Sequence, residues 1–351
     1  MPTFCRHNRL LQNCPICTKE QNIEMRPAVT RFGESEQRAA TGGSRAASGG
    51  SRVASAPHGR RVSGPRGRAA GAGSGGMTVR RLARAVDDGF QSSLVPGLRS
   101  AADARRLADE LALAETRCLA LAQAPFGLYA ELADDGVEIE QRSWLAFEIA
   151  WLSPLEGDED PFAAIAAARV PWEPEGDAVP DAELARCGPR GTWSAATAAR
   201  TAAAYGGWVR RAGSQAAAYA GEPSWTPERR FDRVFERLSL HGLDRAVRFD
   251  LLVTLGGTGL YELRAGSLHL GGGDPVTVAA KRILGIGDPM LLDRRAAELA
   301  SACGVSLQAL DLGFFNWERG ERYNAGLPAG AEPDEDVRAA ARAAFGLDAG
   351  P

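Results

Sequence analysis

The sequence has no long hydrophobic run and almost no lysine. No apolar stretch approaches the roughly 20 residues that a membrane-spanning helix needs, and no hydrophobic signal-peptide core follows the polar N-terminus. We therefore expect a protein that is neither secreted nor embedded in a membrane, with a cytoplasmic location. Only Lys19 and Lys281 are lysines, so arginine carries almost all of the positive charge. We attribute this bias to a GC-rich genome rather than to a chemical requirement.

Several familiar catalytic motifs are also absent. The sequence contains no Walker loop, no Rossmann fingerprint and no Ser-His-Asp order typical of a hydrolase. His241 and His269, the histidines of the C-terminal part, lie in no recognisable ligand spacing. We expect each of them at the surface or at an interface.

Charge is distributed unevenly along the chain. The net charge is −3, but residues 26–84 hold twelve arginines against two glutamates, so the rest of the chain carries −13. Residues 26–76 consist mainly of Gly, Ser, Ala and Arg, and they lack the large apolar side chains that would offset the entropy of ordering. We predict a disordered basic linker, which either follows phosphates without reading sequence or is only a spacer.

Residues 1–25 contain four potential metal ligands within thirteen residues: Cys5, His7, Cys14 and Cys17. A Cys-x-x-Cys pair can hold one face of a tetrahedral Zn²⁺, and the other two residues can fill the remaining positions. Because so short a segment has no hydrophobic core, metal binding would supply its folding energy. We predict a closed, structural Zn²⁺ site. The alternatives are a redox role for the Cys-x-x-Cys pair or four unrelated residues.

The remaining chain, residues 77–346, shows helical periodicity. Asp288, Pro289 and Gly304 are typical start and stop signals of one helix. Residues 260–270 could hold a short β-hairpin, the only candidate for β structure. The fold class is therefore mainly α, with eight to ten helices. The other predicted helical segments are 102–123, 141–152, 192–219 with a break at Gly206-Gly207, 226–239, 243–255 and 333–345.

Two glycine turns precede helical runs in the C-terminal part. One contains Gly271 and Gly273, and the other contains Gly285 and Gly287 with isoleucine between them. A Gly-hydrophobic-Gly turn between helices allows backbone N–H groups to approach a phosphate at a helix N-terminus, as in the helix-hairpin-helix element that binds DNA. The second turn has this Gly-hydrophobic-Gly form and the first does not. Together with Arg282, these four glycines are our candidate DNA-binding residues.

The helix after the turns resembles the aspartate-led helix of the helix-hairpin-helix DNA glycosylase superfamily. In that superfamily an apolar pair precedes an aspartate, as Leu291-Leu292 precedes Asp293, and a glycine closes the helix, as Gly304 does here. The aspartate follows the hairpin by about twenty residues, which matches the spacing from Gly273 and so favours the first turn. If the first turn is the hairpin, Pro275 replaces the lysine of lyase-competent members, and no Schiff-base mechanism is expected there.

A more particular resemblance covers most of the chain. The segments FCRHNRLLQNCPICTKE, SWLAFEIAWLSPLEGDEDPFAAI and ILGIGDPMLLDRRAAELA resemble the α-glutamyl/putrescinyl thymine pyrophosphorylase family, in particular its third clade with a cysteine-rich head. The resemblance implies a helix-hairpin-helix glycosylase-like helical domain, preceded by a cysteine-rich head that matches the small zinc-binding module. The basic linker departs from the family pattern. It implies an activity on a modified pyrimidine in DNA, in which an amine displaces pyrophosphate.

The resemblance also suggests catalytic residues. Asp293 could orient or deprotonate the amine, and its place near a helix N-terminus favours the ionised form. Arg294 and Arg295 could hold phosphate oxygens. A helix carboxylate paired with a neighbouring arginine is the alternative for Asp293. The aromatic residues Trp144, Phe147 and Trp151 could stack a flipped base or belong to the core.

The acidic character of the chain outside residues 26–84 leaves other functions open. A broad DNA-binding face is not expected there, although Arg248 and Arg282 could form a local patch with the arginines beside Asp293. The alternative function is a non-catalytic, zinc-containing protein that binds nucleic acid or acts as an adaptor.

Overall fold

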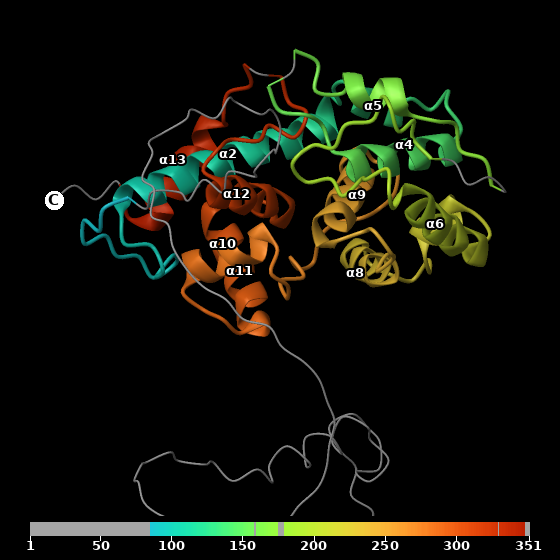
Figure 1. Cartoon of the computed structure of the whole chain (residues 1–351). Helices are drawn as coiled ribbons and strands as arrows, with labels where there is room; N and C mark the ends of the chain where they lie inside the picture. The colour runs from blue at the N-terminus through green and yellow to red at the C-terminus, as the bar shows by residue number, and fades with distance from the viewer. Residues whose placement is uncertain (1–84, 158, 175–178, 329, 348–351) are drawn as a thin grey trace, which may run out of the picture. The chain divides into compact units, whose positions relative to one another are not determined.

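The computed structural model describes residues 85–157, 159–174, 179–328 and 330–347, which belong to a unit spanning Gly76–Pro351. These residues form twelve helices and no strand, so the mainly α fold class is confirmed (Figure 1). Among them, no helix is long and apolar enough to cross a membrane. The helices are α2 (Ala101–Gln123), α3 (Leu128–Leu132), α4 (Ile139–Leu152), α5 (Ala163–Ala168), α6 (Ala198–Ala212), α7 (Gln215–Ala220), α8 (Pro227–Arg237), α9 (Arg245–Gly257), α10 (Pro275–Leu284), α11 (Pro289–Cys303), α12 (Leu307–Arg319) and α13 (Glu335–Phe345).

The helices pack in two groups, which can be followed in Figure 1. In the first group, α2 packs against α12 and α13, α10 packs against α12, and α11 contacts α10, α12 and α13. In the second group, α4 is central and packs against α3, α5, α7 and α9, while α6 and α8 pack against α7. The two groups meet where α2 packs against α9. We call them the α2/α12 group and the α4/α9 group.

Helix boundaries follow from capping side chains. The Asp288 carboxylate accepts hydrogen bonds from the N–H groups of Met290 and Leu291, Pro289 occupies the first turn, and Gly304 closes α11 in the left-handed conformation with φ of 68°. The start and stop signals in the sequence therefore gave the correct helix. The predicted segments 102–123, 141–152, 226–239, 243–255 and 333–345 are likewise confirmed as α2, α4, α8, α9 and α13.

Three predictions about local structure are wrong. Helix α6 continues through Gly206-Gly207 and ends at Gly213, whose φ of 94° reverses the chain before Ser214 caps α7. A helix-interior glycine costs only about 1 kcal/mol relative to alanine, which packing can offset. Residues 260–270 form no β-hairpin. The described part of the chain contains twelve helices, whereas eight to ten were expected, and the short helices α3, α5 and α7 account for the difference.

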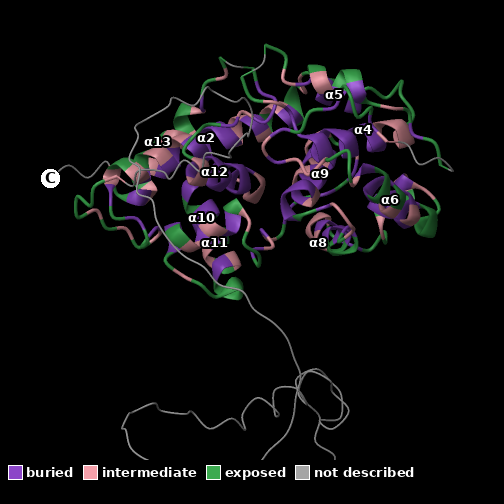
Figure 2. Cartoon of the chain, in the orientation of Figure 1, coloured by how far each residue is buried: buried purple, intermediate pink, exposed green. Residues whose placement is uncertain are grey.

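From Ser143 to its end at Leu152, helix α4 is buried on every side, which fits the dense apolar sequence there (Figure 2). Trp144, Phe147 and Trp151 are at most 2% exposed. The Phe147 ring stacks on Tyr205 of α6, with ring centroids 4.0 Å apart. These aromatic residues therefore belong to the core rather than to a base-stacking surface.

Candidate functional site at the 268–274 loop

In the loop between α9 and α10, two charged side chains bond the backbone of Leu268. The Leu268 N–H donates to Oδ1 of Asp293 on α11 at 3.1 Å, and its carbonyl oxygen accepts a hydrogen bond from Nε of Arg245 on α9 at 2.9 Å. One backbone segment therefore lies between a carboxylate of the α2/α12 group and a guanidinium of the α4/α9 group. Hydrogen bonds of this charge-assisted kind are about twice as strong as neutral ones, so they fix the position of the loop.

His269 follows directly and has an unusual backbone conformation. Its φ of 53° lies in the left-handed region, which residues other than glycine rarely adopt. The imidazole stacks on Phe235 of α8, with ring centroids 3.9 Å apart, and its Nε2 lies 3.0 Å from Oδ1 of Asp232. The geometry of this contact with Asp232 is not that of a hydrogen bond. The two side chains form an ion pair only when the imidazole is protonated. A strained backbone costs about 1–3 kcal/mol, and such strain is concentrated at functional sites.

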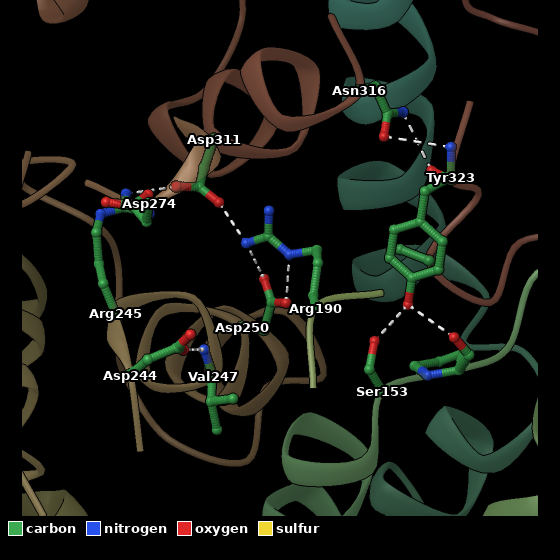
Figure 3. A network of polar contacts seen from close by, with 12 residues as sticks. Ser153, Arg190, Asp244, Arg245, Val247, Asp250, Asp274, Asp311, Asn316 and Tyr323 are labelled. Atoms are coloured by element: carbon green, nitrogen blue, oxygen red, sulfur yellow. Dashed lines mark hydrogen bonds and ion pairs between the residues drawn. The ribbon is translucent and has the colours of Figure 1, made fainter. Parts of the chain in front are cut away.

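Beneath the loop lies a buried network of arginines and aspartates (Figure 3). Arg190 contacts Asp250 at 2.6 Å and Asp311 at 2.5 Å, and Arg245 contacts the second oxygen of Asp311 at 2.5 Å. Arg245 also lies 3.5 Å from Asp274, the N-cap residue of α10. Two buried cations thus face three carboxylates, and the chain of contacts ends at the first glycine turn.

Burial and neighbouring charges act in opposite directions on the aspartates. Burial alone would raise the pKa of Asp311, but the guanidiniums of Arg245 and Arg190 outweigh it and lower that pKa. For Asp293, burial is the larger effect and raises its pKa, although the N–H groups of Leu268 and Leu270 oppose it. The shift is opposite in direction to the one expected from a helix N-terminus alone.

The two glycine turns differ in their surroundings. Gly271 and Gly273 are exposed, have no φ in the left-handed region, and would have no neighbouring atom within 4 Å of an added Cβ. The second turn joins α10 directly to α11, with Gly285 in the left-handed conformation and Gly287 also in open space. The second turn therefore joins two helices directly, whereas the first is part of the 268–274 loop that Asp293 holds at Leu268.

The arginines predicted to bind phosphate point elsewhere. Arg294 and Arg295 both pair with Glu298, which lies about one turn further along the same helix, at 3.6 Å and 2.7 Å. Arg295 also donates to the carbonyl oxygen of Ser93 at 2.8 Å. Arg282 pairs with a glutamate of α12. The structure thus brings Asp293 to the 268–274 loop but does not place the two arginines beside its carboxylate.

The predicted zinc ligands Cys5, His7, Cys14 and Cys17 lie outside the described residues, as does the basic linker. Within the part of the chain that the structure describes, no group of three or more His, Cys, Asp or Glu residues could hold a metal ion.

The sequence reasoning missed His269, Arg190, Arg245, Asp250 and Asp311. No local pattern marks them. Arg190, Asp311 and the α9 residues Arg245 and Asp250 come from three separate segments and meet through the fold. Comparisons of the chain with family profiles, with curated proteins and with solved structures found no match.

Proposed function

We propose that the helical unit is a helix-hairpin-helix glycosylase-like domain that binds DNA at the 268–274 loop and modifies a pyrimidine base. The observation that carries this proposal is the hydrogen bond between Asp293 and the Leu268 N–H. The spacing from Gly273 selected Asp293 from the sequence, and the carboxylate contacts the segment that leads into the same glycine turn. We also propose that residues 1–25 bind one structural Zn²⁺.

The surroundings of Gly271 and Gly273 support a role in ligand contact. At both positions the backbone φ lies outside the left-handed region and an added Cβ would meet no atom within 4 Å, so the fold itself does not require glycine there. A side chain at either position would project only into solvent, where it would hinder a phosphate from approaching the backbone. We propose that glycine at these positions leaves the backbone open to a partner.

The proposed reaction is a displacement at an exocyclic carbon. The amine nitrogen attacks the methylene carbon of a 5-(pyrophosphoryloxymethyl) pyrimidine, the carbon–oxygen bond breaks, and pyrophosphate leaves. The attacking amine must lose a proton, and we assign His269 as the base that accepts this proton. The carboxylate of Asp232, 3.0 Å from Nε2 of His269, would stabilise the resulting imidazolium. Asp293 would act as a positioning residue that holds His269 through the flanking backbone. The base must be flipped out or single-stranded to reach the loop.

The binding step can be tested by comparing the two turns. Gly273→Ala and Gly287→Ala both add a methyl group in open space, so neither should alter the melting temperature. Fluorescence anisotropy with single-stranded and duplex oligonucleotides should show weaker binding for Gly273→Ala alone. Equal loss in both variants would assign contact to both turns, and wild-type affinity of Gly273→Ala would refute binding at the 268–274 loop.

The chemical step requires its own measurement. Pyrophosphate release from DNA carrying the modified pyrimidine, in the presence of an amine, should be lost in His269→Gln while DNA affinity is retained. Asp293→Asn should reduce the rate through misplacement of His269. Release at the wild-type rate by His269→Gln would show that the imidazole has no part in the reaction.

A non-catalytic nucleic-acid-binding protein or zinc-containing adaptor is the second candidate. It is favoured by the contacts of the predicted catalytic groups, because Asp293 is engaged by backbone N–H groups and Arg294 and Arg295 pair with Glu298. This candidate predicts DNA binding without pyrophosphate release. An adaptor without any nucleic-acid role predicts neither.

A further inference from the structure

A cavity of about 390 Å³ lies in the α4/α9 group and shares no lining residue with the 268–274 loop. It is formed by α3, α4, α5 and the segment that follows α5. Its volume falls within the range of small-molecule sites. The walls combine the apolar side chains of Val137, Leu145 and Ala166 with a few charged groups; Trp144, Val170 and Pro171 complete the apolar part.

Glu148 is the most buried charged group that lines this cavity. The residue is 1% exposed, and its Oε1 accepts a hydrogen bond from the Val170 N–H at 3.0 Å. A buried carboxylate ordinarily has a cationic partner, because the desolvation of a lone charge is costly. No ion pair of Glu148 is present among the described residues.

The arginines that line the cavity are engaged with other carboxylates. Arg169 pairs with Glu131 at 2.6 Å, and Arg142 pairs with Asp135 at 3.0 Å. Arg142 also donates to the carbonyl oxygen of Leu132 at 3.3 Å. Of the other polar groups, the Gln141 amide bonds the backbone N–H and carbonyl of Trp172, and the Trp144 indole N–H donates to the Val170 carbonyl oxygen at 2.8 Å. Glu148 is therefore the carboxyl group of the cavity lining that has no ion pair among the described residues.

We propose that this cavity binds a small alkylammonium compound, whose charged nitrogen pairs with Glu148 and whose methylene groups contact the apolar walls. A neutral or anionic ligand would leave the Glu148 carboxyl without a cation, whereas an ammonium group supplies one. The inference does not depend on the proposed DNA activity.

The protonation of Glu148 provides a specific signature. Burial raises its pKa to about 8, although the Val170 N–H and the charge of Arg169 oppose the shift. The other charged groups that line the cavity are Glu131 from α3 and Arg142 from α4. At pH 7 most molecules therefore carry a neutral Glu148, and an ammonium ligand that favours the ionised form must release the proton.

The test uses n-butylammonium as the probe and n-butanol as its neutral counterpart. Isothermal titration calorimetry in two buffers of different ionisation enthalpy measures the protons released on binding. We expect close to one proton per bound n-butylammonium at pH 7 and close to none at pH 9, with affinity rising about tenfold between these pH values. n-Butanol should bind at least tenfold more weakly at pH 9.

Glu148→Gln should abolish proton release and lower the affinity for n-butylammonium at least tenfold. Glu138→Gln is the matched control, because Glu138 lies at the start of the same helix, is exposed and does not line the cavity. Absence of binding by the wild-type protein, binding without proton release at pH 7, or equal affinity for n-butanol would each overturn the proposal. The wild-type measurements decide even if Glu148→Gln fails to fold.

Discussion

Replacement of Asp311 by asparagine should destabilise the helical unit strongly. Asp311 is 1% exposed, and each of its carboxylate oxygens contacts a different guanidinium, that of Arg190 and that of Arg245, at 2.5 Å. Asparagine keeps one acceptor and turns an amide N–H₂ group toward the other guanidinium. Donor then faces donor, and a buried cation loses the charge that compensates it.

The size of the effect follows from what each arginine retains. Removal of one partner from a buried ion pair typically costs about 3–5 kcal/mol. Arg190 keeps Asp250 at 2.6 Å, and Arg245 keeps the Leu268 carbonyl oxygen at 2.9 Å, so the lower end of this range applies. A loss of about 3 kcal/mol lowers the melting temperature of a domain of this size by roughly 6–12 °C.

Thermal melts followed by circular dichroism measure this effect, with Asp135→Asn as the control. Asp135 also pairs with an arginine, Arg142, but its side chain is 97% exposed, so the control should melt like wild type. Because the pKa of Asp311 is lowered in the folded state, its contribution is complete at pH 5 to 7 and disappears only as the pH falls below its ordinary value of 3.8. Equal melting temperatures for Asp311→Asn and wild type at pH 7 would refute the reasoning.

Three further predictions concern other parts of the chain. The pKa of Glu148 is about 8 in the folded protein and 4.5 in the unfolded chain, so the unfolded chain ionises first and the free energy of unfolding of the wild type should fall as the pH rises from 4.5 to 8. Urea denaturation at several pH values should show no such fall for Glu148→Gln. The same pH dependence of stability in both proteins would contradict the assignment. A Cys14→Ser/Cys17→Ser variant should contain less zinc than wild type by elemental analysis, and equal zinc would exclude the predicted site. Gly97→Ala should destabilise by about 1–3 kcal/mol, because a Cβ would lie 1.8 Å from the backbone carbonyl oxygen of Arg282; an unchanged melting temperature would show that the backbone moves freely there.

Elements governed by local chemistry could be predicted from the sequence. Helix α11 begins with Asp288 and Pro289 and ends at Gly304 as expected, because capping depends on neighbouring backbone groups. The β-hairpin over 260–270 was wrong because side chains distant in sequence determine that segment. The Leu268 backbone is held by Asp293 and Arg245, so its conformation follows from the tertiary fold and not from its own residues.

The candidate site could be predicted only in part, for the same reason. Asp293 was predicted as a site residue because it lies at a fixed distance along the chain from Gly273, which a sequence pattern can detect, and the structure places it against the Leu268 N–H. Arg190 and Asp311 are 121 residues apart, and nothing in either segment indicates that they meet. The positive φ of His269 is equally invisible, since it arises from the contacts that fix its neighbours.

The Leu268 peptide joins the buried network to the exposed loop, and this explains how the candidate site keeps its geometry. Arg245 shares Asp311 with Arg190 and donates to the Leu268 carbonyl, so the core of the α2/α12 group is connected to that carbonyl through two charged contacts. Asp293 holds the N–H of the same residue. With both polar groups of Leu268 fixed, the strained conformation of the next residue, His269, cannot relax by moving the preceding backbone. Asp293 therefore restricts where the His269 imidazole can lie without contacting it directly.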